Sequence, residues 1–345
     1  MNWSVLRNCL AACLLLTGLL IGCSGDEPTA VTDIDGAIIE EDADHDAHEA
    51  EGGMLALPTL QSVDLSGGKL RVIATTGIIG DVVAQVAGDA IELTTLMGPG
   101  QDPHSYEPGA RELTAVADAH LIFVNGWNLE EGLIKNLVAI GENALIVPIS
   151  ANIEPLSMPP NPKGVTGVDP HVWVSIHSVE QWVKNISAVL SVLDSTNAAV
   201  YAANADRYLG ELAILDAYAQ EQLAVIPAGQ RVLVTNHRAF SYFARDYDFE
   251  MLGTVIPGLS SLSEPSADDL ADLIGKMESR SVCAIFTETT VSDQLAQVVA
   301  AELTVCDAVK VLPLYTGSLG PPGSGADNYL GMMQFNVDTI AAGLR

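Results

Sequence analysis

The stretch TNAAVYAANADRYLGELAILDAYAQEQL, residues 196–223, decides how the rest of the chain is organised. It is rich in Ala, Leu, Glu and Gln, it contains no proline, and Ser195 or Thr196 is a candidate N-cap. A helix of about 28 residues would be about 42 Å long, which exceeds the usual helix of a small domain. Pro227-Ala228-Gly229 ends it. We therefore expect one long helix, within residues 195–226, that acts as a spacer between two lobes.

On both sides of this helix, short apolar runs typical of buried strands alternate with helical patterns. The predicted strands are 70–74, 91–96, 120–124 and 145–147 in the first half, and 231–235, 250–255, 282–286 and 309–312 in the second. Such alternation predicts a mainly parallel sheet that is covered on both faces. The expected fold class is therefore α/β, with two Rossmann-like lobes, residues 67–194 and 227–345, joined by one long rigid helix.

The first 22 residues have the pattern of a targeting segment. Arg7 precedes an apolar run of 13 residues, Cys9 to Ile21, which is shorter than the roughly 20 residues of a membrane span and typical of a signal-peptide core. The run ends in Leu20-Ile21-Gly22-Cys23, which resembles the lipobox of bacterial lipoproteins. The resemblance implies cleavage of residues 1–22, a lipid on Cys23, and an extracytoplasmic protein anchored to the cell membrane on its periplasmic or cell-surface side. An uncleaved anchor is the alternative.

Residues 23–66 form an acidic segment with 12 acidic residues and no Lys or Arg. The segment has little hydrophobic patterning, which predicts a disordered tether. His45 and His48 lie among its carboxylates, and this composition either recruits divalent metal ions loosely or is an ordinary solvated spacer. The whole chain carries a net charge of −29. That charge argues against nucleic acid as a partner, because its phosphates require clusters of Lys and Arg.

Two cysteines, Cys283 and Cys306, remain outside the targeting segment and the lipidation position. In an oxidising compartment, an even pair of cysteines favours a disulfide. Two buried free thiols are the alternative, because the spacing in the sequence does not show whether the two Cα atoms are close enough to be bridged.

The tripeptide Asp-Pro-His occurs twice, ending at His104 and at His171, and a third histidine, His237, follows a predicted strand. Ligand sites of open α/β sheets form at the carboxyl ends of strands. The proline before His104 and before His171 fixes the backbone and disfavours helix, so each imidazole is held at low entropic cost. A single Asp-Pro-His is more simply the start of a turn. Two of them, together with His237, predict a transition-metal site. Two other histidines are not expected to belong to it: we expect His120 at a strand edge and His177 on the surface.

From Leu70 to the C-terminus the chain resembles the bacterial zinc/manganese solute-binding proteins of ABC importers. The matching stretches occur in the same order and are 97–108 (MGPGQDPHSYEP), 123–126 (FVNG), 169–173 (DPHVW), 237–243 (HRAFSYF), 264–266 (EPS), 286–289 (FTET) and 329–333 (YLGMM). The resemblance implies two α/β lobes bridged by one long rigid helix, with the metal between the lobes. It also implies that His104 and His171 come from the first lobe and His237 from the second.

The fourth ligand position is where the sequence departs from the family. Many members have an Asp in the loop that reads LYTGSLG here, residues 314–320, and Gly317 stands in its place without a ligand atom. Glu288 or a water molecule would then complete the site, and Asp327 is a more remote candidate. Three imidazoles with one oxygen suit Zn²⁺, whereas Mn²⁺ prefers more carboxylate oxygen. We therefore expect Zn²⁺, with Mn²⁺ as the alternative.

The resemblance implies a receptor that binds a metal ion without acting as an enzyme. It would deliver the ion to an ABC permease and its ATPase, and we expect it to be a monomer. A zinc hydrolase is the rival function, because three His ligands and an open water position also occur in catalytic sites and Glu288 could act as the base. The sequence contains no His-Glu-x-x-His pattern, which counts against this rival.

Overall fold

The structure is a computed structural model that describes residues 53–141, 144–158 and 167–345. Residues 1–22, Cys23, His45 and His48 lie outside the described residues, so the expectations for them stay predictions. Within the described residues, no helix is both long enough and apolar enough to cross a membrane.

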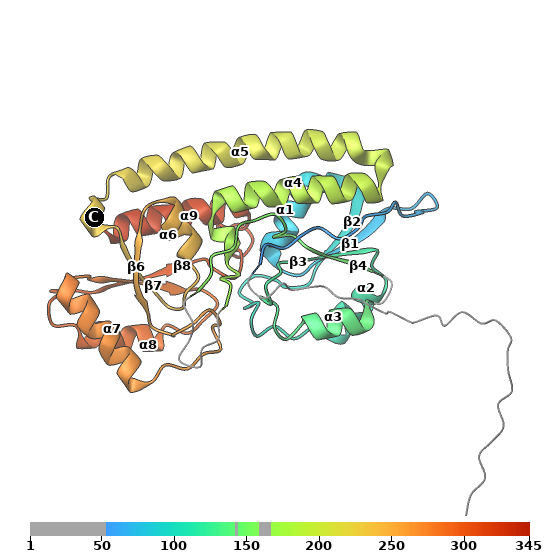
Figure 1. Cartoon of the computed structure of the whole chain (residues 1–345). Coiled ribbons are helices and arrows are strands. Elements are labelled where there is room, and N and C mark those ends of the chain that lie inside the picture. Colours follow the sequence, from blue (N-terminus) through green and yellow to red (C-terminus); the bar gives the residue numbers. More distant parts are fainter. Residues whose placement is uncertain (1–52, 142–143, 159–166) are drawn as a thin grey trace, which may run out of the picture. The chain divides into compact units, whose positions relative to one another are not determined.

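The first lobe is built on a sheet of four parallel strands in the order β2-β1-β3-β4 (Figure 1). The strands are β1 Leu70–Ala74, β2 Ile91–Thr95, β3 Leu121–Val124 and β4 Leu145–Pro148, and the helices are α1 Gly77–Ala87, α2 Ala110–Ala117, α3 Ile134–Ile140 and α4 Ile176–Leu193. Alternate residues of β1 and β3 point to opposite faces, so one face packs on α1 and α4 and the other on α2 and α3. This is why the two inner strands are apolar in almost every position.

The second lobe repeats the same topology, with four parallel strands in the order β6-β5-β7-β8. The strands are β5 Val232–Thr235, β6 Glu250–Thr254, β7 Ala284–Glu288 and β8 Lys310–Leu314, and the helices are α6 Ser241–Asp246, α7 Ala267–Arg280, α8 Gln294–Glu302 and α9 Tyr329–Gly343. Helices α7 and α8 cover one face of this sheet, and α9 packs on the other. The prediction of an α/β fold with two parallel-sheet lobes is confirmed.

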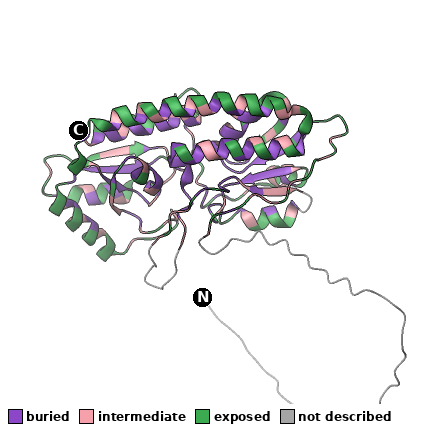
Figure 2. Ribbon diagram, turned by 45° about the horizontal axis from the view of Figure 1, so that its top comes forward, coloured by how far each residue is buried: buried purple, intermediate pink, exposed green. Residues whose placement is uncertain are grey.

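The long helix predicted from residues 196–223 is α5, Ala198–Ala224, with 27 residues. Its buried side chains recur every three or four positions and form one stripe: Tyr201, Ala205, Tyr208, Leu212, Leu215, Ala219 and Leu223. Figure 2 shows this buried stripe along the helix, with an exposed face opposite. The stripe packs on α1 and α4 of the first lobe and on α9 of the second, so α5 joins the two lobes along its length.

The start of α5 differs from the expected cap. Ser195–Asn197 form a short 3-10 turn, η3, and Asn197 is the residue before the helix, so neither Ser195 nor Thr196 is its N-cap. The carboxylate of Asp194 holds the turn, because its Oδ2 accepts hydrogen bonds from Asn197 Nδ2 and from the Tyr201 hydroxyl, both at 2.7 Å. Three further 3-10 segments are η1 Gly88–Ala90, η2 Val172–Val174 and η4 Ala228–Gln230.

Residues 53–66, the last part of the expected tether, lie against the first lobe. Leu55 is 8% exposed and belongs to the hydrophobic core. The indole of Trp127 donates to the Gly53 carbonyl at 3.1 Å, and the Val63 amide donates to the Leu193 carbonyl at 3.0 Å. Residues of the expected tether therefore pack on the first lobe before residue 67, where the sequence predicts that the lobe begins.

A disulfide joins Cys283 and Cys306, whose Cα atoms are 5.8 Å apart. Cys283 comes directly before β7, and Cys306 lies between α8 and β8. Of the two alternatives that the sequence leaves open, the structure therefore has the disulfide.

Candidate metal centre

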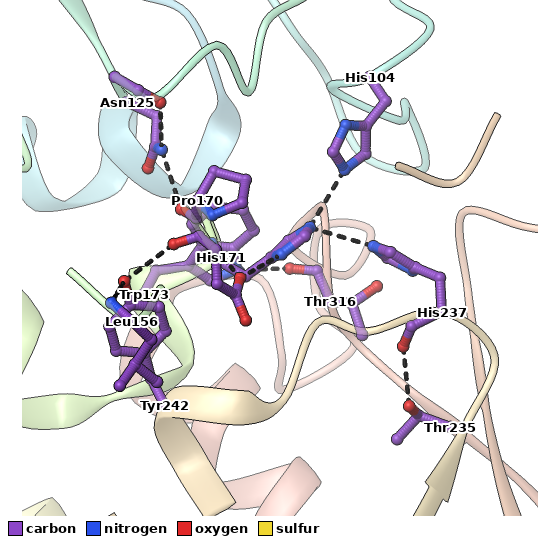
Figure 3. A network of polar contacts seen from close by, with 12 residues as sticks. His104, Asn125, Leu156, Pro170, His171, Trp173, Thr235, His237, Tyr242 and Thr316 are labelled. Atoms are coloured by element: carbon purple, nitrogen blue, oxygen red, sulfur yellow. Dashed lines mark hydrogen bonds and ion pairs between the residues drawn. The ribbon is translucent and has the colours of Figure 1, made fainter. Parts of the chain in front are cut away.

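Three histidines converge between the lobes. His104 lies in the loop between β2 and α2, His171 comes directly before η2, and His237 follows β5 by two residues. They are 3%, 1% and 3% exposed, respectively. The Nε2 atom of His171 is 3.1 Å from that of His104 and 3.0 Å from that of His237, so His171 stands in the middle (Figure 3). Among the described residues, these three form the one group of His, Cys, Asp and Glu side chains arranged to hold a metal ion.

The two Asp-Pro-His tripeptides make the same hydrogen bond from the histidine amide to the aspartate side chain. The carboxylate Oδ1 of Asp102 accepts the His104 amide at 3.1 Å, and Oδ1 of Asp169 accepts the His171 amide at 3.0 Å. The intervening proline has no amide hydrogen and fixes its own φ, so the backbone between the two residues is restricted. The side chain of each histidine is thereby aimed from a rigid loop.

Carboxylates lie on the far side of the histidine rings, at Nδ1. Asp169 Oδ1 is 2.7 Å from His171 Nδ1, and Glu288 Oε1 is hydrogen-bonded to His237 Nδ1. His104 Nδ1 is 3.4 Å from Glu131 Oε1 and makes no hydrogen bond within the described residues. A carboxylate at Nδ1 holds the proton on that nitrogen and leaves the Nε2 lone pair free, as in carboxylate–histidine–zinc triads.

The pKa values of two ligand histidines are shifted in opposite directions. The shift at His104 favours metal binding over protonation, and the shift at His237 opposes it. Burial, together with the neighbouring rings of His171 and His237, lowers the pKa of His104 to about 2. Burial also acts to lower the pKa of His237, but the Glu288 carboxylate outweighs it and raises that pKa above its usual value. His104 is therefore a ready lone-pair donor, whereas His237 takes up a proton more readily than an ordinary histidine, and that proton competes with a metal ion.

The arrangement can coordinate a small cation. Where two facing Nε2 atoms both carry lone pairs they repel, because an acceptor cannot hydrogen-bond to another acceptor. A tetrahedral Zn²⁺ ion with Zn–N bonds of about 2.0–2.1 Å separates its nitrogen ligands by roughly 3.4 Å. The observed separations of 3.0 and 3.1 Å are close to this value, so small movements of the rings would complete the coordination.

Glu288 is not placed as the fourth ligand that the sequence suggested. It lies at the carboxyl end of β7, and its Oε1 faces the amide and Nδ1 of His237. Its Oε2 accepts a 2.6 Å hydrogen bond from the Thr316 hydroxyl. Both oxygens are therefore engaged by His237 and Thr316. Burial raises the pKa of Glu288, but the His237 ring outweighs burial and lowers it, so the group stays ionised and orients His237.

The loop with Gly317 also supplies no carboxylate. A Cβ atom on Gly317 would lie 2.8 Å from Pro103 Cδ, so this position packs directly on the first Asp-Pro-His. Asp327 is exposed, and its Oδ2 accepts the Gly323 amide at 2.7 Å, within its own loop. Among the described residues, no carboxylate oxygen joins the three histidines.

Three supporting residues were not predicted as part of the site. The indole of Trp173 packs against the His171 ring, with 5.4 Å between the ring centroids. Its Nε1 donates to the Thr316 carbonyl at 2.6 Å. The Tyr242 hydroxyl donates to the Asp169 carbonyl at 2.8 Å, and Asn125 Nδ2 donates to the Pro170 carbonyl at 2.9 Å (Figure 3). All three residues belong to stretches that carry the family resemblance. Polar groups within those apolar stretches were the feature of the sequence that could have indicated them as part of the site.

The remaining described histidines lie elsewhere, as expected. His120 comes directly before β3, and its Nδ1 accepts the amide of Arg71 in β1 at 3.1 Å, which is a strand-edge position. His177 is on α4 with a side chain that is 54% exposed. Both predictions are confirmed.

Comparison with known proteins identifies the family. The model of the family described as zinc-uptake complex component A, periplasmic (ZnuA), matches residues 72–343. The chain belongs to this family. It is therefore a metal-binding, substrate-binding component of an ABC importer, which works with a permease and an ATPase and is not an enzyme. The rival interpretation as a zinc hydrolase is set aside.

Individual relatives and structures agree with this assignment. The manganese-binding lipoprotein MntA of Halalkalibacterium halodurans is 34% identical over 278 residues, which are 81% of this chain and 89% of MntA. The manganese ABC transporter substrate-binding lipoprotein PsaA of Streptococcus pneumoniae serotype 4 is 32% identical, over 81% of this chain and 90% of PsaA. The periplasmic zinc binding protein TroA of Treponema pallidum superposes with a TM-score of 0.73 at 31% identity, over 80% of this chain and 99% of TroA.

Proposed function

We propose that this protein captures Zn²⁺ between its lobes through His104, His171 and His237 and delivers it to its permease. The observation that carries the proposal is the convergence of three Nε2 atoms with no carboxylate oxygen beside them among the described residues. Nitrogen donors in tetrahedral geometry suit Zn²⁺, with water in the fourth position. Each neutral imidazole would replace one water molecule of the ion.

Carboxylates behind the rings would strengthen this capture. Asp169 and Glu288 hydrogen-bond to the Nδ1 atoms of His171 and His237, which increases the basicity of the opposite nitrogen and fixes the direction of the ring. His104 lacks such a bond within the described residues, although Glu131 lies 3.4 Å away. We propose that Asp169 and Glu288 orient the ligands and do not bind the metal themselves.

Manganese is the second candidate cargo. The relatives MntA and PsaA are named for manganese, and a Mn-bound periplasmic metal binding protein from candidatus Liberibacter asiaticus superposes with a TM-score of 0.72 at 28% identity, over 80% of this chain and 100% of that one. Mn²⁺ favours carboxylate and water oxygens. Among the described residues, Gly317 and the orientation of Glu288 leave nitrogen donors alone at the site, which favours zinc.

Direct metal competition tests the proposal. Protein freed of metal by a chelator would be offered equal Zn²⁺ and Mn²⁺, and the bound ions would be measured by elemental analysis. We expect one equivalent of zinc in wild type, strong loss of zinc in His237→Ala, and no change in the matched control His177→Ala. Retention of manganese over zinc by the wild type would overturn the choice of zinc, and equal binding by His237→Ala would overturn the site.

We also propose how the protein is placed in the cell. Residues 1–22 would be removed as a signal peptide, a lipid on Cys23 would anchor a monomer, and the acidic segment after Cys23 would tether the two lobes, residues 67–194 and 227–345. The relatives MntA and PsaA are named lipoproteins, which supports this reading. A Cys23→Ala variant should leave the membrane fraction and lose the lipid mass. A wild-type chain without lipid mass would contradict the proposal.

A further inference from the structure

The first Asp-Pro-His loop, residues 98–104, lies at the rim of the metal site. Gly100 and Gln101 are exposed and Asp102 is half-buried, whereas the His104 ring at the end of the loop is only 3% exposed. Because all three ligand rings are buried, a bound ion cannot leave this arrangement unless one ligand loop moves. Of the three loops that carry a ligand, the first Asp-Pro-His loop at the rim is the least buried.

Two hydrogen bonds tie this loop to the second lobe. The Ser261 hydroxyl donates to Asp102 Oδ2 at 2.5 Å, and the Gly100 amide donates to the Ser318 hydroxyl oxygen at 2.7 Å. Ser261 follows β6 and Ser318 follows β8, so both partners belong to the other lobe. Other bonds of the loop are local, such as that from the Gly98 amide to Gln101 Oε1 at 2.6 Å.

The second Asp-Pro-His is tied to the second lobe in a different place. The Tyr242 hydroxyl donates to the Asp169 carbonyl, and the Trp173 indole donates to the Thr316 carbonyl. The four residues are between 0% and 2% exposed. Opening these buried bonds would strand polar groups away from water, whereas Asp102 and Ser261 are half-buried and can exchange their bond for water.

We propose that the first Asp-Pro-His loop is the gate of the metal site, and that the Asp102–Ser261 hydrogen bond is the latch that sets how fast the ion enters and leaves. When the latch opens, the loop swings away with His104, so the site opens and loses one ligand in the same movement. His171 and His237 keep their positions. The inference rests on the proposed metal capture and adds the residues that control release.

The latch can be removed without touching a ligand. Ser261→Ala deletes the hydroxyl that reaches Asp102, and Ser260→Ala is the matched control, because the Ser260 hydroxyl oxygen accepts only the Leu262 amide of its own loop at 3.3 Å. Zinc-loaded protein would be mixed with excess chelator in a stopped-flow instrument, and zinc entry would be timed in the reverse experiment. We expect release from Ser261→Ala to be roughly tenfold faster, as for loss of one hydrogen bond to a charged group.

Further outcomes separate a latch from a general loss of structure. Ser261→Thr keeps the hydroxyl and should restore slow release, and all three variants should melt with the wild type. Equal release rates for Ser261→Ala and Ser260→Ala, in protein that binds zinc, would overturn the gate alone. A wild-type protein that binds no zinc would overturn the proposed capture and the gate with it.

Discussion

The two Asp-Pro-His tripeptides share three residues and one hydrogen bond from the aspartate side chain to the histidine amide, yet their carboxylates have different further partners. Asp169 is fully buried and turns Oδ1 to both the amide and the Nδ1 of its own histidine, His171. Asp102 uses Oδ1 for the amide of His104 in the same way, but its Oδ2 reaches Ser261 in the other lobe. The first tripeptide therefore connects the lobes, and the second orients a ligand.

This difference divides the site into a fixed part and a movable part. His171 stands between the other two rings and is held by buried bonds from both lobes. His104 stands at the rim, and its Nδ1 makes no hydrogen bond within the described residues. A receptor must bind its ion tightly and still give it up, and a site with one loosely held ligand serves both needs.

Removal of each histidine in turn is the strongest test of the difference between the two tripeptides. His171→Ala removes the central ligand, and we expect zinc affinity to fall roughly 100- to 1,000-fold, which is about one ligand's share of a typical zinc-site binding energy. His104→Ala should cost about tenfold less, because that ring is less firmly oriented. Competition against a chelator of known affinity measures both. Equal losses would show that the two tripeptides are equivalent ligands.

The pH dependence should come from the second lobe and not from the first Asp-Pro-His. His104, with a pKa lowered to about 2, stays neutral at any ordinary pH. His237 has a raised pKa because Glu288 outweighs burial, and its protonated form has no lone pair at Nε2. Zinc must displace that proton below this pKa, so affinity should fall as the pH drops, by roughly 100-fold between pH 7.5 and 5.

A single substitution checks the origin of this pH dependence. Glu288→Gln removes the charge that raises the pKa of His237, so the loss of affinity should begin at a lower pH than in the wild type. Zinc titrations at several pH values would show the shift. An unchanged affinity at pH 5 would mean that no ligand carries a competing proton.

The carboxylates of the two tripeptides can be compared directly. Asp169→Asn preserves shape but removes the charge behind His171, and we expect a 10- to 100-fold loss of zinc affinity, as is common for outer partners of ligand histidines. Asp102→Asn keeps an oxygen for the His104 amide, and its Nδ2 can donate to the Ser261 hydroxyl oxygen, so affinity should change by less than about threefold. Similar affinity losses in both variants would contradict the division of roles.

Much of the fold could be predicted from the sequence, because it depends on repeating local patterns. The eight predicted strands and α5 agree with the structure to within a few residues, since apolar runs and a long proline-free stretch leave few alternatives. Two features were missed for a physical reason. The turn that begins α5, in place of the expected cap at Ser195 or Thr196, depends on one carboxylate, Asp194, and the burial of Leu55 depends on contacts with a lobe far along the chain.

The metal site, like the fold, could be predicted from the sequence only in part. Three histidines could be recognised because a ligand needs a particular side chain, and the repeated tripeptide draws attention to two of them. The direction of Glu288 could not be predicted, because it depends on Thr316 and on the His237 ring, which approach it only after folding. The different uses of Asp102 and Asp169 were equally hidden, since the two tripeptides are identical as sequence.

A small effect is also expected at Gly317, which lies against the first Asp-Pro-His. In Gly317→Ala the new Cβ would lie 2.8 Å from Pro103 Cδ, too close for either to stay in place. The rigid proline ring passes the displacement to His104, and overpacking of this kind should weaken zinc binding about fivefold. Gly275→Ala, on α7 with nothing within 4 Å of the new atom, is the matched control. If Gly317→Ala binds zinc like that control, the first loop yields without moving its histidine, and the gate must then be sought in Ser261 alone.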